Sequence, residues 1–276
     1  MGALFRHILS VFSKNEAVRC KKGVIHIGAH RCEEDDDYNL LNAAHETLWI
    51  DGNDELCEAN PKIVNAVVSN QDDADVEFII TSNDAMSSSI LELKDHKIEH
   101  PDCLETKRVS KKTTTLNTLF DRLEFAHDRY DLMALDVQGA ELHVLQGASK
   151  ILPHINTIIT EVSTKELYQG CVLLHTLDDF LYERGFVRVF VEMTRHGWGD
   201  AVYVRRCVSV TITSGLGNRL FQLAFLYALA KDTNSIPVLY RRHIYPCGIH
   251  SDDGRKYDRL YELFTILEDN DHSSTH

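Results

Sequence analysis

Short apolar runs that end in small or polar residues recur along much of the chain. They lie at residues 24–28, 48–51, 63–68, 76–81, 131–137 and 156–162. Uninterrupted apolar runs of this length are typical of strands buried on both faces of a parallel sheet. Because parallel strands finish at one edge of a sheet, the residues that follow these runs are expected to lie close together.

Segments with helical spacing separate the runs. Apolar residues at helical intervals predict helices over 116–123, 141–152 and 173–184, and another around Leu40, Leu41 and Ala44. Asn53 is placed to cap a further short helix. The alternation of strand and helix predicts a three-layer α/β sandwich with a mostly parallel sheet.

The rest of this region is less regular. Residues 186–192 and 201–204 predict a hairpin and therefore one antiparallel strand. Residues 92–112 are charged and show no clear period, and the polar run 82–89 fits either a flexible surface loop or a pocket wall.

A second βα unit is predicted near the carboxyl end. Residues 208–213 resemble a new strand, 215–218 a glycine turn and 219–231 an apolar helix. The segment is too short to close another Rossmann-like domain. We therefore divide the chain into an amphipathic extension at 1–22, a main domain at 23–205 and a partial unit at 206–276.

The composition of the chain indicates which partners it is expected to bind and in which compartment it is expected to lie. The 276 residues carry a formal net charge of -13, which disfavours nucleic acid and anionic membranes as partners. The 7 cysteines are scattered without a CxxC pair, as expected for reduced thiols in a cytoplasmic protein without a zinc site. No membrane span is predicted, and the oligomeric state is not predicted.

The predicted strand ends carry the residues of a cofactor pocket. Gly28 follows the first strand, and Asp51 ends the second at about the spacing where an acid meets a nucleotide ribose. Only Ala29 and His30 follow Gly28, so the turn lacks the glycines that a pyrophosphate needs. S-adenosyl-L-methionine has no phosphate, and this pattern favours it; a simple tight turn is the alternative.

An ordered series of motifs resembles the FkbM-type methyltransferase family over about residues 23–205. The motifs are HIGAHRCEE (26–34), WID (49–51), SSSI (87–90), TTTLNTLF (113–120), DVQGAELHVLQGA (136–148) and TEVS (160–163). The resemblance implies a Rossmann-like class I methyltransferase fold. It also implies transfer of a methyl group from S-adenosyl-L-methionine to a hydroxyl of a sugar or glycan.

The chemistry of methyl transfer and the resemblance together predict the site residues. Candidate bases are the strand-end carboxylates Asp136 and Glu161 and the imidazole of His30, with Asp136 favoured. The resemblance implies cofactor contacts from His26, Gly28, Ala29, Asp51, Ser88, Ser89 and Asp136. Gln138, Glu161 and Glu34 are expected to contact the acceptor.

Two interpretations stay open at this point. Glu141 is either a site residue or an acid at a helix start. A divalent cation is compatible with the carboxylates, although no spacing requires one.

Residues 214–224 are similar to the opening of alpha-1,2-fucosyltransferases, and the similarity extends over about residues 208–245. It implies a truncated sugar-transfer module without activity of its own, which favours a glycan acceptor. For the whole chain, the alternatives to an active methyltransferase are a non-catalytic scaffold or binding module of a glycan-assembly protein and a fragment of a bifunctional methyltransferase/fucosyltransferase. Many FkbM-type relatives have acids where His26 and Gln138 stand, which is the feature that favours the scaffold.

Overall fold

The computed structural model describes residues 22–38, 46–212, 216–240 and 265–267. The chain divides into two compact units, Met1–Val204 and Arg205–His276. The predicted extension at residues 1–22, apart from residue 22 itself, and the predicted helix around Leu40 lie outside the described residues. In the described part of the chain, no helix has the length and apolar content needed to cross a membrane.

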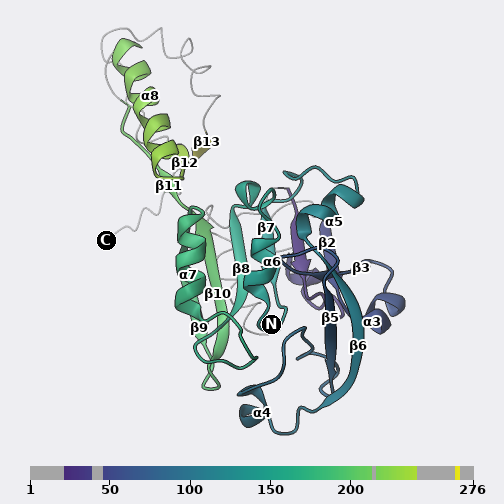
Figure 1. Ribbon diagram of the computed structural model, residues 1–276. Helices are drawn as coiled ribbons and strands as arrows, with labels where there is room; N and C mark the ends of the chain where they lie inside the picture. The colour runs from purple at the N-terminus through teal and green to yellow at the C-terminus, as the bar shows by residue number, and fades with distance from the viewer. Residues whose placement is uncertain (1–21, 39–45, 213–215, 241–264, 268–276) are drawn as a thin grey trace. The chain divides into compact units, whose positions relative to one another are not determined.

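A seven-stranded sheet forms the centre of the first unit (Figure 1). Its strands are β1 (Val24–Ile27), β2 (Thr47–Asp51), β3 (Ile63–Asn65), β7 (Leu132–Leu135), β8 (Thr157–Ser163), β9 (Phe186–Met193) and β10 (Trp198–Arg205). Their order is β3-β2-β1-β7-β8-β10-β9. Neighbours from β3 to β8 run parallel, and β10 runs antiparallel to β8. The predicted mostly parallel sheet with an antiparallel strand, and with it the Rossmann-like fold, is confirmed.

Apolar side chains cover both faces of the sheet because successive strand residues point to opposite sides. On one face, Ile25 and Ile27 belong to a core that includes α5 (Leu116–Arg122), α6 (Glu141–Gln146) and α7 (Leu174–Glu183). Figure 1 shows these three helices on the same side of the sheet. On the other face, Val24 packs with Trp49 and with Tyr38 of α2 (Asp35–Tyr38).

A second sheet was not predicted. It has the order β4-β6-β5, with β4 at Val67–Val68, β5 at Asp75–Thr81 and β6 at Glu105–Thr114. The predicted strand 63–68 is wrong as a single element, because the amide of Ala66 donates to the Asp51 carbonyl and the chain then passes from one sheet to the other.

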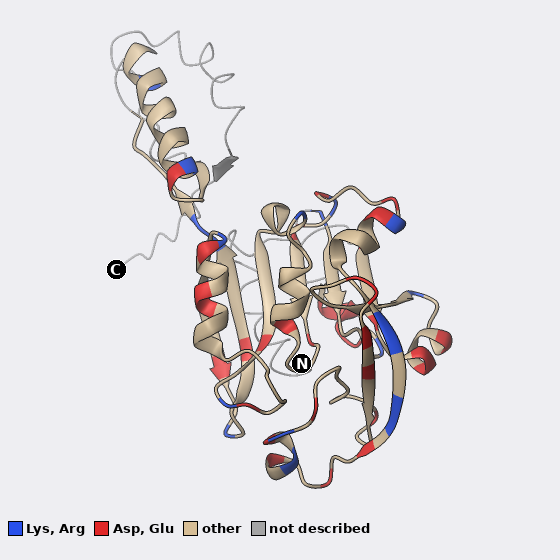
Figure 2. Cartoon of the chain, viewed as in Figure 1, with Lys and Arg blue, Asp and Glu red and all other residues tan. Residues whose placement is uncertain are grey.

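The charged stretch 92–112 is also more regular than predicted. It contains α4 (His96–Glu99) and most of the ten-residue strand β6. Most of β6 is exposed, and Figure 2 shows Lys and Arg positions at two places along the strand. An exposed charged strand of this kind has no apolar run to reveal it.

One predicted helix has different bounds, and another begins as predicted. The helix predicted over 141–152 ends at Gln146 and is followed by the 3₁₀ turn η3 (Leu152–His154). A Cβ at Gly147 would lie 2.1 Å from the Ser69 carbonyl oxygen, so the chain is tightly packed where the helix stops. The short helix α3 (Asp54–Ala59) begins as predicted, with the Asn53 side chain accepting from the Glu55 amide.

The second unit contains a three-stranded parallel sheet and one long helix among its described residues. The strands are β11 (Cys207–Val208), β12 (Ile236–Tyr240) and β13 (Thr265–Leu267), and the helix is α8 (Leu216–Asp232). The strand predicted over 208–213 is therefore shorter, and the predicted turn at 216–218 is helical instead. Open space surrounds Gly217, so nothing in its surroundings requires glycine.

Candidate active site

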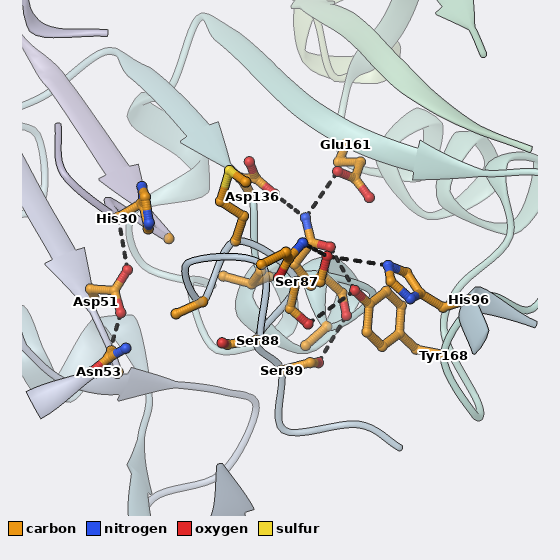
Figure 3. Close-up of a pocket in the computed structure, with 18 of the residues that line it drawn as sticks. His30, Asp51, Asn53, Ser87, Ser88, Ser89, His96, Asp136, Glu161 and Tyr168 are labelled. Atoms are coloured by element: carbon orange, nitrogen blue, oxygen red, sulfur yellow. Dashed lines mark hydrogen bonds between the residues drawn. The ribbon is translucent and has the colours of Figure 1, made fainter. Parts of the chain in front are cut away.

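A cavity of about 830 Å³ opens where the strands of the central sheet end. Gly28 follows β1, Asp51 ends β2, Asp136 follows β7 and Glu161 lies near the end of β8, and all four line the cavity. Residues from four separate strands are thus brought to one place, as expected for the carboxyl edge of a parallel sheet. Figure 3 shows the polar side chains that project into this space.

Gly28 brings the turn after β1 against Asp136. Its φ is 88°, and a Cβ at this position would lie 1.8 Å from the Asp136 carbonyl oxygen. The amide of Asp136 donates to the Ile27 carbonyl at 2.9 Å. Only glycine therefore allows the first turn and the end of β7 to approach this closely.

Two backbone amides orient the carboxylate of Asp51. The amide of His30 donates to Oδ2 at 2.9 Å, and the amide of Asn53 donates to Oδ1 at 2.8 Å. Burial raises the pKa of Asp51, and the two amides act in the opposite direction. The carboxylate keeps lone pairs for further donors, which is what hydrogen bonding to a pair of ribose hydroxyls requires.

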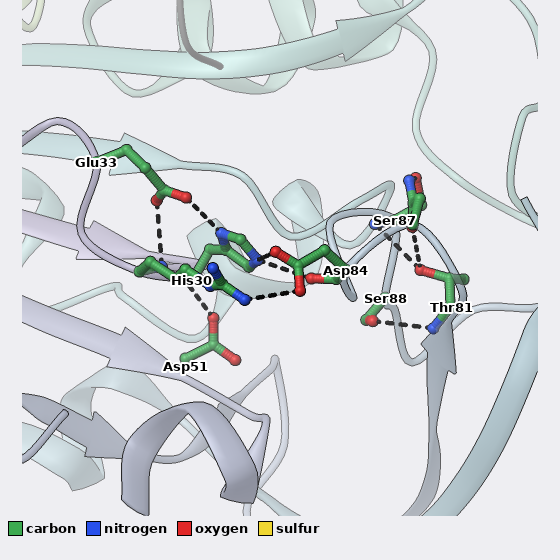
Figure 4. Close-up of polar contacts among 9 residues, drawn as sticks. His30, Glu33, Asp51, Thr81, Asp84, Ser87 and Ser88 are labelled. Carbon is green, nitrogen blue, oxygen red and sulfur yellow. Dashed lines mark hydrogen bonds and ion pairs between the residues drawn. The ribbon is translucent and has the colours of Figure 1, made fainter. Parts of the chain in front are cut away.

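The imidazole of His30 is held on both sides (Figure 4). Its Nδ1 lies 2.6 Å from Glu33 Oε1, and its Nε2 lies 2.8 Å from the Asp84 carbonyl oxygen. Burial disfavours the charged ring, but the Asp84 carbonyl and the Glu33 carboxylate together raise the pKa of His30. Both ring nitrogens are engaged, so His30 is poorly placed to accept a further proton.

The polar run after β5 forms a wall of the cavity. Ser87, Ser88 and Ser89 all line it. Ser88 Oγ accepts from the Thr81 amide at 3.3 Å, and Ser89 Oγ donates to the Gln138 carbonyl at 2.8 Å. These contacts join the loop to β5 and to the turn after β7, so the pocket-wall interpretation agrees with the structure.

Gln138 connects the two carboxylates at the centre of the site. Its Nε2 donates to Asp136 Oδ1 at 2.6 Å and to Glu161 Oε2 at 3.0 Å. Its Oε1 accepts from the Tyr168 hydroxyl at 2.6 Å. The primary amide has two hydrogens, and each meets a different carboxylate.

Several carboxyl groups in and near the site have a raised pKa. Glu161 is 8% exposed; burial raises its pKa well above the usual value, and the negative charge of Asp136 adds to this shift. Burial also raises the pKa of Glu34, which lines the cavity, to about 7. Asp200 pairs in register with Glu161 and is 0% exposed, and burial raises its pKa to about 7.

Glu141 does not line the cavity. It is the first residue of α6, it is buried, and its Oε1 accepts from the Gly139 amide at 3.0 Å. Burial raises its pKa to about 7. Its position agrees with the interpretation as an acid at a helix start.

The structure places His26 outside the cavity, contrary to the expected cofactor contact. β1 directs this side chain to the opposite face of the sheet, where Nδ1 lies 2.7 Å from the Tyr38 hydroxyl. The ring packs against Trp49 at a centroid distance of 4.9 Å, and burial lowers its pKa to about 4. The other expected cofactor and acceptor residues, including Ala29, do line the cavity.

Comparison with known proteins agrees with this architecture. Residues 26–188 match the family model described as "Methyltransferase FkbM domain". The chain belongs to the FkbM methyltransferase family. The matched segment runs from β1 into β9 and includes Gly28, Asp51, Asp136 and Glu161.

A relative of this chain carries a more specific name. Over 96 residues the chain is 33% identical to the 2-O-methyltransferase NoeI of Sinorhizobium fredii (strain NBRC 101917 / NGR234). The aligned region covers 35% of this chain and 39% of that protein. The FkbM match does not extend to residues 208–245, and the similarity of that segment to fucosyltransferases stays a prediction without support.

The FkbM site contains side chains that the sequence did not reveal. The cavity is also lined by residues from distant segments: His96 and His100 from the region of α4, Tyr168 from the segment after β8, His196 from the β9–β10 turn and Trp198 from the start of β10. The helix α4 is too short to give a periodic signal. Among the described residues, no three His, Cys, Asp or Glu side chains are arranged to hold a metal ion.

Proposed function

We propose that this FkbM protein transfers the methyl group of S-adenosyl-L-methionine to a hydroxyl group of a sugar or glycan. The observation that carries the proposal is that Gly28, Asp51 and Asp136 line one cavity in a methyltransferase-family domain. A donor held along Gly28 and Asp51 would end beside Asp136.

The charge of the cavity suits this donor. Among the described residues, its lining contains one Lys or Arg, which is Arg195. Its acidic residues are Glu33, Glu34, Asp51, Glu99, Asp102, Asp136 and Glu161. S-adenosyl-L-methionine has a sulfonium, an ammonium and one carboxylate, so it is a net cation. A dinucleotide pyrophosphate would meet this acidic lining without the backbone cradle that such a group needs.

The positions of the residues suggest how the donor is held. Gly28 and Ala29 would contact its methionine part, Asp51 its ribose hydroxyls, and Ser88 and Ser89 its adenine side. The bound donor supplies an electrophilic methyl group: the acceptor oxygen forms a bond to it as the carbon–sulfur bond breaks.

Asp136 is the favoured proton acceptor among the three candidate bases. His30 has both ring nitrogens engaged, and Glu161 holds its proton more firmly because its pKa is raised. In our proposal Asp136 accepts the hydroxyl proton of the sugar. Gln138 and Glu161 orient the acceptor oxygen beside it, which reduces the entropy cost of alignment.

The name of the relative supports transfer to oxygen. NoeI is named as a 2-O-methyltransferase, which is methyl transfer to oxygen. The cavity volume of about 830 Å³ lies in the upper part of the range of roughly 300–1,000 Å³ for ligand pockets, so it has room for a donor and a sugar together.

The test is transfer of a labelled methyl group from S-adenosyl-L-methionine to a panel of monosaccharides and oligosaccharides. We expect label in at least one sugar, and loss of about 100-fold or more in kcat for Asp136→Asn. Asp179→Asn, which changes an exposed residue of α7, is the matched control and is expected to leave kcat unchanged. Transfer at the wild-type rate by Asp136→Asn, or no labelled sugar, would overturn the proposal.

A further inference from the structure

A row of three imidazoles forms the wall of the cavity next to Tyr168. We call His96, His100 and His196 the histidine row. The ring centroids of His96 and His100 are 4.9 Å apart, and those of His100 and His196 are 4.8 Å apart. The interplanar angles are 44° and 43°, so neighbouring rings are tilted relative to each other. Trp198, two residues after His196, lines the same cavity.

The histidine row is connected to the proposed transfer centre. His96 Nε2 lies 3.2 Å from Ser87 Oγ, and the His96 ring packs against Tyr168 at a centroid distance of 5.4 Å. Figure 3 shows His96 and Tyr168 side by side next to Ser87. Tyr168 donates to Gln138, which bridges Asp136 and Glu161. A molecule resting on the row is therefore close to the groups that would receive its hydroxyl.

Polar contacts hold the far end of the row. His196 Nδ1 lies 2.9 Å from Glu99 Oε2, and the other oxygen of Glu99 pairs with Lys165. Arg195 Nε lies 3.1 Å from His196 Nε2. These partners fix the ring plane of His196, so the histidine row forms one held surface of the cavity wall.

Much of the row carries no positive charge at neutral pH. Burial, with a contribution from His100, lowers the pKa of His96 to about 4. Burial and the neighbouring His196 lower the pKa of His100. Glu99 and Asp102 are carboxylates in the same wall, and Arg195 is the cation available there. A carboxylate, sulfate or phosphate on the acceptor would meet Arg195, the one Lys or Arg of the described cavity lining, and would face the carboxylates of Asp102 and Asp136.

We infer that the histidine row and Trp198 form the acceptor subsite, and that this subsite takes an uncharged sugar unit in preference to an anionic one. The inference rests on the proposed function. The apolar C–H face of a pyranose ring packs well on aromatic rings, and ring nitrogens and carboxylates accept and donate the hydrogen bonds of its hydroxyls. Uronates, sulfated sugars and nucleotide-linked sugars are disfavoured by the acidic surroundings.

The test uses the full chain labelled with ¹³C at histidine and saturated with S-adenosylhomocysteine. The probes are two matched pairs: methyl glucopyranoside with its uronate, and methyl galactopyranoside with its uronate. Each pair differs only in oxidation at C6. We expect the His100 and His196 resonances to shift with at least one neutral member, and its uronate to bind about tenfold more weakly or worse. No shift with either neutral glycoside, or equal or tighter binding of the uronate, overturns the inference.

Variants assign the resonances and test the role of the row. His100→Ala is expected to raise KM or Kd for the neutral glycoside about tenfold, with affinity for S-adenosyl-L-methionine unchanged. His100→Phe keeps a ring and should recover part of this loss. His175→Ala, an exposed residue of α7, is the control.

Failure of this inference is separable from failure of the proposed function. Calorimetry with S-adenosyl-L-methionine on the same sample tests the donor site alone. Donor binding without any response of the histidine row would remove only the acceptor subsite. Absence of donor binding would remove the proposed function, and the glycoside titration can still be read on the unliganded protein.

Discussion

The hydroxyl of Tyr168 donates to the side-chain oxygen of Gln138 at 2.6 Å, and this contact decides which way the Gln138 amide faces. With its oxygen held by Tyr168, the amide must direct its two hydrogens toward Asp136 and Glu161. Reversing the amide would place its oxygen against two carboxylates. The arrangement at the end of β7 is therefore set by a residue that lies 30 positions further along the chain.

Tyr168→Phe tests this arrangement. Loss of the hydroxyl leaves the half-buried amide oxygen without its donor, at a cost of about 1–3 kcal/mol, and frees the amide to turn. We expect kcat for methyl transfer to fall about tenfold or more while the Kd of S-adenosyl-L-methionine stays the same. Tyr203→Phe is the control, because the buried Tyr203 hydroxyl donates to Asp178 outside the cavity. Equal kcat for wild type and Tyr168→Phe would contradict the positioning role.

Gly28→Ala tests the close approach of the first turn to Asp136. The added Cβ would lie 1.8 Å from a backbone oxygen, at a residue whose φ is 88°. Both effects destabilise the fold, and we expect a loss of about 3 kcal/mol or more in the free energy of unfolding. Denaturant unfolding measures it.

Gly170→Ala is the matched control for that substitution. Gly170 has a similar φ of 76°, but a Cβ there would have nothing within 4 Å. Only the backbone strain then applies, which is about 1–2 kcal/mol. An equal loss in the free energy of unfolding for Gly28→Ala and Gly170→Ala would show that the close approach to Asp136 adds nothing to the cost of the substitution.

Asp200 should make the stability of the protein depend on pH. Its folded pKa of about 7 lies above the ordinary value of 3.8, and neither carboxylate oxygen has a hydrogen-bond partner among the described residues. The folded state therefore binds the extra proton between these two pH values. The contribution of Asp200 to the free energy of unfolding therefore falls as the pH rises from about 4 to about 7. Above pH 7 this contribution stays at its lowest value.

Asp200→Asn removes that titration. The variant should match the wild type near pH 4 and should be more stable by about 2–4 kcal/mol at pH 8, as measured by urea unfolding. Asp178→Asn is a contrasting control, because Asp178 pairs with Arg188 at 2.9 Å and its loss should destabilise the fold. A wild-type advantage over Asp200→Asn at pH 8 would refute this account of Asp200.

The strands that form the cavity could be predicted because burial on both faces leaves a visible signal. Val24, Ile25 and Ile27 are all buried, as are Leu132 to Leu135. The strand ends then place Gly28, Asp51 and Asp136 at one edge by topology alone. His26 misled the prediction because it belongs to the same motif, although alternation along β1 sends its side chain to the opposite face.

The part of the cavity formed by the histidine row and Tyr168, like the neighbouring strand β6, could not be predicted, and the reasons are physical. β6 is mostly exposed and charged, so it lacks an apolar period. His96 and His196 are separated by a hundred positions and meet only through tertiary packing on either side of His100. The acceptor contact of Gln138 stays a prediction, and its bridge between two carboxylates depends on Tyr168, which no local pattern indicates.

The proposed function depends most directly on the binding of S-adenosyl-L-methionine along Gly28 and Asp51. Isothermal titration of the full chain with this donor measures it, with Asp51→Asn as the test variant. Asp54→Asn serves as the control, because Asp54 pairs with Lys111 and lies outside the cavity lining. We predict one donor bound per chain, about tenfold or more weaker binding for Asp51→Asn, and unchanged binding for Asp54→Asn. Absence of donor binding to the wild type, or equal affinity in the Asp51→Asn variant, would contradict the account.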